Sequence, residues 1–499
     1  MRSLLLAACL LAAALRSSGE LVLPISFTPV PVADSSVLYP MYANTSLDGV
    51  FVTGLQFGTP PQTLQLLIDT GSGITHVAGR GCGSSCGVGL SPEAGFDAQA
   101  SSSAQRLPCD ERCSCPQCEC QTQGVEEPYC VFRIAYAMGD SSSGSLWTDK
   151  VDMASGSYSN VSLTFGVEER QTGKIAAMNI EGLLALDRSR DSFVGQMRAQ
   201  NLTDLLAFGT CWEVDYMGSE QGYPSTNATS FLMLGLPERV MAEVQPQWTP
   251  LLAGASQHEW RVGLESIQVE GPGGGDVTVD LFQPTLHSRG GSASSSSDAS
   301  SSSSDSSSSS DSSSSSDSSS GGSDSLSGQK FAPAVVDSGT TFVRLPRAAW
   351  KQFQQLIINA TEALGEADLV QAAEAGTCWQ SHVPGALFNN ATALAAAFPA
   401  IRFRFQGGAE FEADPRGYLT SPRANDDRFA CLSFFPWPQS TLPSLSGLTL
   451  IGSRVRQNVL TLHDDTNERV GFAQVGDCTA LAERWSEARG GGPATASAA

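Results

Sequence analysis

Two short segments of the sequence each place an aspartate between an apolar run and a glycine. The first is Leu66-Leu67-Ile68-Asp69-Thr70-Gly71-Ser72, and the second, in the other half of the chain, is Ala334-Val335-Val336-Asp337-Ser338-Gly339-Thr340. The apolar run carries the carboxylate into a buried position, the glycine permits a tight turn, and the flanking hydroxyls can hydrogen-bond the acid. A single Asp-Thr-Gly is usually a plain turn. Two copies in matching contexts indicate a pair of acids that act together.

The chemistry of such a pair follows from the repulsion between two buried carboxylates. Two carboxyl groups within about 3 Å of each other cannot both ionise, so one pKa rises, the other falls, and the pair holds one proton. The ionised member can then take a proton from water while the protonated member polarises a carbonyl group. This reaction needs no covalent intermediate, metal or cofactor, and we predict none.

The paired motif resembles that of the pepsin-like aspartic proteases, for which the shared proton is well known, and the resemblance extends over most of the chain. It implies an aspartic endopeptidase with Asp69 and Asp337 as catalytic acids, and Thr70 and Ser338 as braces between the two active-site loops. Residues Phe57 to Gln62 and Leu450 to Ser453 resemble the hairpin before the first acid and the packing element behind the second. The segment from Ile134 to Gly144 resembles the flap that closes over substrate, with Tyr136 and Gly139 as its substrate-binding residues.

Three residues depart from the family pattern. Ala185 stands where relatives usually carry glycine in the first packing element, and Asp187 replaces another common glycine. A small backbone shift can absorb the added methyl group of Ala185. His76 occupies the position of a tryptophan that hydrogen-bonds the flap tyrosine in many relatives. An imidazole can still make that bond, but its charge then varies with pH.

The elements that must position these residues are mostly strands. Apolar and β-branched runs of four to eight residues recur between glycine, proline, asparagine or serine, which predicts an all-β fold with few helices. Strands are expected at residues 50–57, 64–68, 131–136, 163–167, 260–269, 334–336 and 401–405, and one helix over 347–364. The resemblance to the pepsin-like family implies that each copy of the duplicated motif belongs to one of two β lobes, with the active site in the cleft between them.

The domain organisation follows from these elements and from composition. We expect a signal peptide at 1–19, an N-terminal segment at 20–45 that is a candidate short propeptide, and a first lobe at 46–240. That lobe holds a cysteine-rich insert at 80–130 and the flap at 131–150. A second lobe covers 241–480 and contains a serine- and aspartate-rich loop at 284–329, and 481–499 form a flexible tail. The loop has too few apolar side chains to fold, and it is read as a spacer, a phosphorylated segment or a weak calcium binder.

The amino terminus and the cysteine count indicate the secretory pathway. A short apolar run after Arg2 predicts a signal peptide, with an uncleaved anchor as the alternative, and no later run exceeds it. Removal of the signal peptide leaves an even number of cysteines, and an even number in an exported protein favours disulfides. The protein is expected to be secreted or lumenal, in the endoplasmic reticulum, the Golgi or an acidic vacuole. Six sequons agree with this route: Asn44, Asn160, Asn201, Asn227, Asn359 and Asn390.

Eight cysteines crowd between the first aspartate and the flap: Cys82, Cys86, Cys109, Cys113, Cys115, Cys118, Cys120 and Cys130. Cys115 and Cys118 have the spacing of a zinc knuckle, but the oxidising compartment favours four disulfides of undetermined connectivity. The insert resembles that of nepenthesin-like proteases and of the processing protease plasmepsin V. In the second half, a resemblance to beta-secretase-like members implies the pairs Cys211–Cys478 and Cys378–Cys431.

Charge and missing motifs narrow the partners. The net charge of -22 repels nucleic acid and anionic lipid, so we expect protein or peptide substrates, no transmembrane anchor and a monomer. The chain has five histidines, no Gly-X-Ser-X-Gly elbow and no His-Glu-X-X-His helix, which disfavours serine and zinc hydrolases. The remaining rival is a catalytically silent pepsin-fold binding or inhibitor protein, although both acid motifs are complete.

Overall fold

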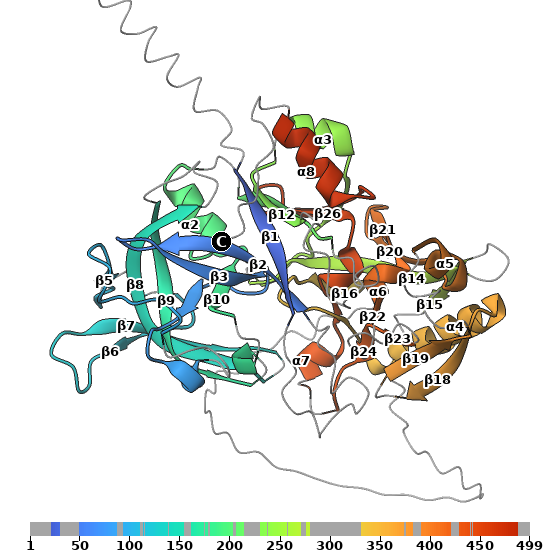
Figure 1. Ribbon diagram of the computed structural model, residues 1–499, viewed down its shortest axis with the longest axis horizontal. Coiled ribbons are helices and arrows are strands. Elements are labelled where there is room, and N and C mark those ends of the chain that lie inside the picture. Colours follow the sequence, from blue (N-terminus) through green and yellow to red (C-terminus); the bar gives the residue numbers. More distant parts are fainter. Residues whose placement is uncertain are drawn as a thin grey trace, which may run out of the picture.

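The computed structural model describes residues 21–29, 49–86, 93–213, 230–279, 331–382, 391–420 and 429–487, with short gaps inside several of these ranges. The predicted signal peptide, the serine- and aspartate-rich loop and the last residues of the predicted tail lie outside the described residues. The described part is mostly β, as the sequence predicts, and its strands form sheets in two halves that meet at the centre of the molecule (Figure 1).

The first half is a set of antiparallel hairpins wrapped around one apolar core. The hairpin of β8 and β9 and the sheet next to it bury Phe57, Phe96 and Phe165, whose rings contact one another edge to face. The strands of this half are β1 (Leu21–Pro29), β2 (Gly49–Phe57), β3 (Gln62–Asp69), β4 (His76–Ala78), β5 (Gln105–Arg106), β6 (Cys118–Gln121), β7 (Tyr129–Ala135), β8 (Ser141–Met153), β9 (Val161–Thr172), β10 (Gly182–Ala185), β11 (Ala207–Cys211) and β12 (Ser230–Leu234). Its helices are η1 (Gly83–Ser85), η2 (Ile175–Ala177), α2 (Phe193–Ala199) and α3 (Glu238–Val244).

The second half repeats the strand-rich plan and adds the longest helix. In that helix, α4, Trp350, Phe353 and Ile357 are buried on one face, which confirms the helix predicted over 347–364. The strands are β13 (Gln247–Pro250), β14 (Arg261–Glu270), β15 (Asp276–Val279), β16 (Ala332–Val336), β17 (Val343–Leu345), β18 (Ala367–Ala373), β19 (Gly376–Ser381), β20 (Ile401–Phe405), β21 (Glu410–Ala413), β22 (Leu419–Thr420), β23 (Phe429–Leu432), β24 (Phe434–Pro436), β25 (Thr449–Ile451), β26 (Val459–Asp464) and β27 (Arg469–Gln474). The helices are α4 (Arg347–Leu364), α5 (Ala391–Ala397), α6 (Pro415–Tyr418), α7 (Pro443–Ser446), η3 (Arg454–Arg456) and α8 (Cys478–Glu487).

A continuous sheet joins the halves. Its strand order passes from β13, β27 and β26 of the second half to β11 and β12 of the first, and then through β1 to β2 and β3. Strand β1 therefore lies between β12 and β2, pairing antiparallel with both, and it crosses the middle of the molecule in Figure 1. Hydrogen bonds between strands therefore link the two halves through this sheet.

Candidate active site

The two aspartates are delivered by the same local arrangement of strands in each half. Strand β3 ends at Asp69 and runs parallel to β10, which in turn pairs antiparallel with β4. Strand β16 ends one residue before Asp337 and runs parallel to β25, which pairs antiparallel with β17. The apolar runs seen in the sequence are these buried strands, so each carboxylate emerges from a rigid sheet into the space between the halves.

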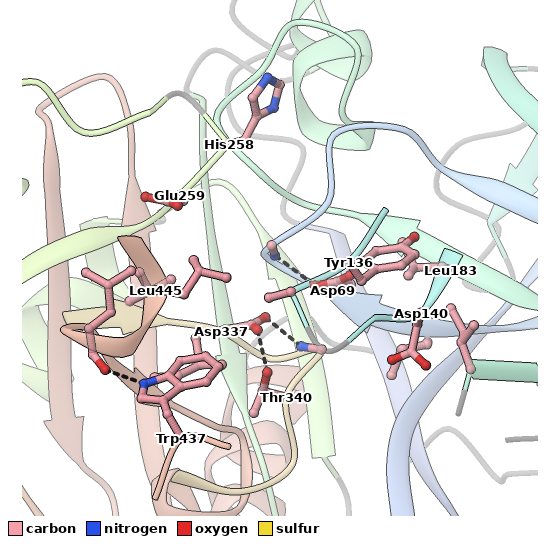
Figure 2. Close-up of a pocket in the computed structure, with 18 residues that line it drawn as sticks. Asp69, Tyr136, Asp140, Leu183, His258, Glu259, Asp337, Thr340, Trp437 and Leu445 are labelled. Atoms are coloured by element: carbon pink, nitrogen blue, oxygen red, sulfur yellow. Dashed lines mark hydrogen bonds between the residues drawn. The ribbon is translucent and has the colours of Figure 1, made fainter. Parts of the chain in front are cut away.

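The two carboxyl groups are neighbours: a Cβ atom on Gly71 would lie 3.2 Å from Oδ1 of each acid, and the two side chains interact with each other. Figure 2 shows both acids lining the same pocket. Asp69 accepts hydrogen bonds from the Gly71 amide at 2.8 Å and the Ser72 hydroxyl at 2.5 Å. Asp337 accepts equivalent bonds from the Gly339 amide at 3.0 Å and the Thr340 hydroxyl at 2.6 Å. The geometry thus gives each acid one amide donor and one hydroxyl donor, in a nearly symmetric pair.

The glycine in each motif is required by the opposite carboxylate. A Cβ atom on Gly339 would lie 2.4 Å from Oδ1 of Asp69, and one on Gly71 would lie 3.2 Å from Oδ1 of Asp337. Any side chain at Gly339 would therefore push the two acids apart. A tight turn with close backbone approach was expected here from the sequence, but it was not visible from the sequence that the close neighbour is the carboxylate of the other half.

Thr70 and Ser338 brace the two loops against each other. The Thr70 amide donates to the Ser338 hydroxyl oxygen and the Ser338 amide donates to the Thr70 hydroxyl oxygen, both at 3.0 Å. Each hydroxyl in turn donates to a backbone carbonyl of the opposite half: Thr70 to Val336 at 3.1 Å, and Ser338 to Ile68 at 2.8 Å. These four buried bonds hold the acids at a fixed separation.

Burial and like charge shift the titration of the pair. Asp69 is almost completely buried, and that burial, followed by the negative charge of Asp337, raises its pKa to about 8, although the bonds from Ser72 and Gly71 oppose the rise. One proton is therefore retained by the pair across the acidic and neutral range. Such a pair can supply both a general base and a general acid at the same pH.

A buried arginine behind the second loop was missed from the sequence. Arg456, in η3, is fully buried, and burial lowers its pKa to about 10, while the charge of Asp337 acts in the opposite direction. Its Nε atom donates to the Gly452 carbonyl at 3.0 Å. A buried positive charge therefore lies within electrostatic reach of Asp337 on this side of the cleft.

The acids lie in a cleft with about 980 Å³ of free volume, part of it open to solvent. Tyr136, which follows β7, and Ala137 and Asp140 of the same turn line one side, as the predicted flap requires. Gly139 adopts a φ of 90°, a backbone conformation that glycine accepts readily at this turn. The second half contributes a largely apolar wall with Val335, Trp437, Leu445, Leu448 and Leu450.

The two packing elements accommodate different residues. Ala185 pairs with Asp69 across the parallel strands, and its methyl group is buried beside an apolar cluster that contains Val52, Leu67 and Leu183. At the corresponding place after β25, a Cβ on Gly452 would lie 2.3 Å from the Phe342 carbonyl oxygen. The first half therefore has room for the extra methyl group and the second half does not.

Asp187 contacts a histidine from the second half. Its carboxylate is buried, its Oδ1 accepts the Ser189 amide at 2.8 Å, and its Oδ2 lies 2.5 Å from Nδ1 of His258. The pKa of His258 is raised, mainly because Asp187 accepts a hydrogen bond from its ring. Burial opposes the rise, and the negative charges of Asp187, Asp191 and Glu259 add to it. His258 also lines the cleft (Figure 2), a role that no sequence pattern indicated.

We expect Asp187→Asn to destabilise the protein more at pH 5.5 than at pH 9. A histidine whose pKa is raised on folding adds stability below its unfolded pKa of about 6.5, and that stability is lost as the pH rises through the folded pKa. Thermal unfolding at both pH values measures the effect, with His382→Gln, a surface histidine beside Asp368, as the control. A loss of the same size at both pH values would show that the pair contributes no charge interaction.

The cysteine-rich insert corrects one expectation. Three disulfides form there, Cys82–Cys86, Cys109–Cys120 and Cys115–Cys118, whereas four were expected. Cys130 is buried, its sulfur atom lies 3.3 Å from the Pro108 carbonyl oxygen, and its cross-strand neighbour Cys120 pairs with Cys109. The disulfide between Cys115 and Cys118 leaves no thiolate pair for the zinc knuckle. Cys211 of β11 bonds Cys478 of α8 and so links the two halves, and Cys378 bonds Cys431 within the second half, as the resemblance implied.

The remaining predicted sites lie on the surface or outside the described residues. Asn201 and Asn359 are exposed, while Asn44, Asn160, Asn227 and Asn390 fall outside the part of the chain that the structure describes. Within that part, His, Cys, Asp and Glu side chains form no group of three or more that could hold a metal ion. None of the described helices is both long and apolar enough to span a membrane.

Comparison with known proteins gives a consistent set of relatives. Residues 51–235 match the family model described as xylanase inhibitor N-terminal, and residues 323–474 match the one described as xylanase inhibitor C-terminal. The chain is 22% identical over 439 residues to aspartic proteinase 36 of Arabidopsis thaliana, covering 85% of this chain and 73% of the relative. It is 23% identical over 432 residues to aspartic proteinase nepenthesin-1 of Nepenthes gracilis, covering 85% and 78%. The expected likeness to plasmepsin V stays a prediction.

Proposed function

Because this chain belongs to the pepsin-fold family that the xylanase inhibitor N-terminal and C-terminal models describe, we propose that it is an aspartic endopeptidase. The observation that carries the proposal is the meeting of Asp69 and Asp337 in one cleft, each with an amide and a hydroxyl donor. Relatives named aspartic proteinases support the same assignment. Proteins and peptides are the substrates, and no cofactor takes part.

The proposed reaction uses the single proton held by the pair. The ionised carboxyl group removes a proton from water, the resulting hydroxide attacks the peptide carbonyl carbon, and the protonated carboxyl group gives its proton to the carbonyl oxygen. The tetrahedral intermediate then collapses: the C–N bond breaks, the amine leaves with a proton from the carboxyl that received it from water, and the other carboxylate takes a proton back from a hydroxyl group of the intermediate as the new carbonyl forms. The pair again holds one proton. The raised pKa of Asp69, caused mainly by its burial and by the charge of Asp337, supports Asp69 as the member that is protonated at the start of the cycle.

The shape of the cleft favours an extended peptide as substrate. Tyr136 and its turn lie on one side of the acids, and the apolar wall with Trp437 and Leu445 lies on the other. An extended chain presents alternate side chains to opposite sides, so apolar side chains next to the cleaved bond can contact this wall. Apolar residues are therefore the preferred neighbours of the cleaved bond.

Turnover of denatured casein and of a peptide library at acidic pH tests the function directly. We expect cleavage that a pepstatin-type inhibitor blocks, because such inhibitors place a hydroxyl group where the attacking water binds between the two acids. Mass spectrometry of the products reports which side chains flank the cut bond. The absence of any turnover between pH 3 and pH 7 by the correctly folded protein would reject the proposal.

The rival is a silent binding protein, since both matching family models carry the name of an inhibitor. Such a protein does not need the shared proton, the braced loops or an accessible cleft beside the acids, and this chain has all three. A titration of the protein into a xylanase assay separates the candidates: inhibition without any peptide cleavage supports the rival.

We also propose that the protein passes through the secretory pathway and is processed at the predicted signal peptide. The five disulfides of the described residues suit an oxidising compartment. Residues Leu21–Pro29 pair with β12 on one side and with β2 on the other. Their removal would expose one edge of each of these strands, so we infer that this part of the 20–45 segment is retained. N-terminal sequencing of the secreted protein decides both points.

A further inference from the structure

Two fully buried ionisable side chains lie beneath Tyr136, and the proposed reaction uses neither. His76 begins β4 and Glu168 is on β9, the strand that pairs in parallel with β4. Nε2 of His76 is 2.7 Å from the Tyr136 hydroxyl oxygen, and Nδ1 of His76 is 2.5 Å from Oε1 of Glu168. Burying two charged groups is costly unless they serve each other or a neighbour.

The direction of each hydrogen bond follows from counting protons, beginning at Asp69. The Ser72 hydroxyl donates its only proton to Asp69, so Ser72 can take part in its hydrogen bond with Tyr136 only as the acceptor. The Tyr136 hydroxyl therefore donates its hydrogen bond to the Ser72 oxygen, and the Tyr136 oxygen accepts a hydrogen bond from Nε2 of His76. Burial, followed by the charges of Asp69, Glu168 and Asp140, raises the pKa of Tyr136 well above 10, so the phenol keeps that proton.

The hydrogen bonds of Glu168 indicate that Nδ1 of His76 carries a proton, as Nε2 does. Glu168 accepts hydrogen bonds from the Ser142 hydroxyl and the Gln171 side-chain amide, both at 2.5 Å. Because two donors are already bound to its oxygens, we infer that Glu168 is a carboxylate, which only accepts. Nδ1 of His76, 2.5 Å from Oε1 of Glu168, then carries a proton as well.

We propose that His76 is a positioning residue that works as an imidazolium, held by Glu168, and that it starts a one-way chain of donors from His76 through Tyr136 and Ser72 to Asp69. The inference rests on the proposed function of the cleft. In this arrangement the charge on His76 fixes where the flap tyrosine lies and which way its proton points. The other strands that face the ring present Phe132 and Leu183, so Glu168 and Tyr136 are its titratable contacts in the described part of the chain.

The arrangement makes the flap sensitive to pH. When His76 loses a proton, one of its two nitrogens becomes an acceptor. If that nitrogen is Nε2, the Tyr136 proton turns towards His76 and leaves Ser72; if it is Nδ1, two acceptors face each other at Glu168. Either change loosens Tyr136 over the substrate, so KM rises while kcat changes less.

The test compares His76→Gln, Glu168→Gln and the double variant with the wild type. A glutamine at 76 can donate to Tyr136, but its oxygen then faces the Glu168 carboxylate; a glutamine at 168 supplies the missing N–H. We expect each single variant to raise KM about tenfold, the size of one lost charged hydrogen bond, and the double variant to recover most of that loss. KM of the double variant is expected to depend less on pH than that of the wild type, because neither glutamine titrates while the pair of acids in the cleft still does. His382→Gln is the matched control.

A second readout does not depend on catalysis. Nitrogen NMR of ¹⁵N-histidine-labelled full-length protein reports the protonation of each ring nitrogen, and subtraction of the His76→Gln spectrum assigns His76. We expect both nitrogens of His76 to be protonated at pH 5 in the wild type and one in Glu168→Gln. A neutral His76 at pH 5, or a double variant whose KM loss is the product of the two single losses, overturns the proposal. A protein without turnover refutes the proposed function, and the NMR result still decides the state of His76.

Discussion

Asp69→Asn and Asp337→Asn should each reduce kcat for peptide hydrolysis by about 10³- to 10⁴-fold, because either change removes the shared proton that makes one acid a base and the other a donor. The asparagine keeps the size of the side chain, and its oxygen can still accept the amide bond of its own loop, while its NH2 group faces the hydroxyl that donated to the acid. Initial rates on a fluorogenic peptide at the pH optimum measure the effect, with the exposed residue change Asp368→Asn as the control. Activity within tenfold of the wild type in either variant would remove the basis for the mechanism.

The same substitution at Asp69 should stabilise the folded protein at neutral pH. The folded state keeps a proton on Asp69 up to a pKa of about 8, whereas the unfolded chain releases it near 4. Because the pKa of this carboxyl group is raised on folding, the folded protein loses stability as the pH rises between these two values. Thermal unfolding of Asp69→Asn should show a smaller decline from pH 4 to pH 8 than the wild type. Loss of activity together with increased stability distinguishes a catalytic residue from a structural one.

Removal of the Cys211–Cys478 disulfide should give the largest loss of stability among single cross-links in the described chain. This bond closes a loop with a sequence separation of 267, and the chain-entropy estimate for such a loop is about 5 kcal/mol. The matched control is the Cys82–Cys86 bond, whose separation is 4 and whose estimate is about 2 kcal/mol. Each pair is changed to alanine and unfolded in urea. Equal losses for the two pairs would contradict the entropic account.

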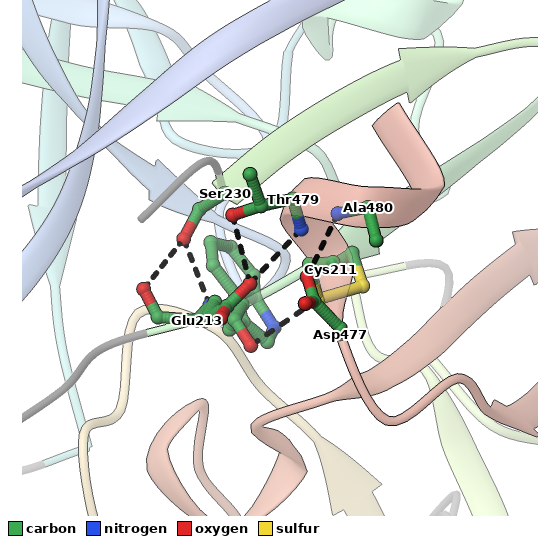
Figure 3. The surroundings of a disulfide bond; sticks show 8 residues. Cys211, Glu213, Ser230, Asp477, Thr479 and Ala480 are labelled. Atoms are coloured by element: carbon green, nitrogen blue, oxygen red, sulfur yellow. Dashed lines mark hydrogen bonds between the residues drawn. A yellow bond between two sulfur atoms is a disulfide. The ribbon is translucent and has the colours of Figure 1, made fainter. Parts of the chain in front are cut away.

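The surroundings of this disulfide limit the damage to the folded state. Beside the bond, the Glu213 carboxylate accepts the amide and hydroxyl of Thr479 at 2.9 and 3.0 Å (Figure 3). Asp477 accepts the Ala480 amide at 2.7 Å and so caps the start of α8. These contacts attach α8 to the central sheet without the sulfur bridge. The variant is therefore expected to fold and cleave peptides at 25 °C while it unfolds more readily.

The sequence predicted the strands and the pair of acids because their signals are local. The run before Asp69 and the run before Asp337 each have the apolar pattern of a buried strand, and both became strands that end at the acids. The helix at 347–364 was equally visible, since Trp350, Phe353 and Ile357 recur at helical spacing. In these elements the residues next to each other in the chain carry the information.

Contacts between distant segments could not be predicted in this way. Glu168 lies in a run of ordinary strand residues, and only the parallel pairing of β4 with β9 brings it to His76. His258 likewise reaches Asp187 through the packing of the two halves, and Arg456 reaches the second active-site loop through the packing of the second half. Four disulfides were expected in the insert and the described residues show three, because an even count of cysteines does not reveal which sulfur atoms the fold brings together.

The crossed bonds between Thr70 and Ser338 also constrain how the molecule can move. Each residue is both donor and acceptor to its counterpart, so the two loops form a single pivot at the bottom of the cleft. A rocking of one half about this pivot would widen or narrow the far ends of the cleft, as the arms of a pair of tongs do, while the acids at the joint stay in register. Long and short peptides can thus be gripped differently without any change in the reacting groups.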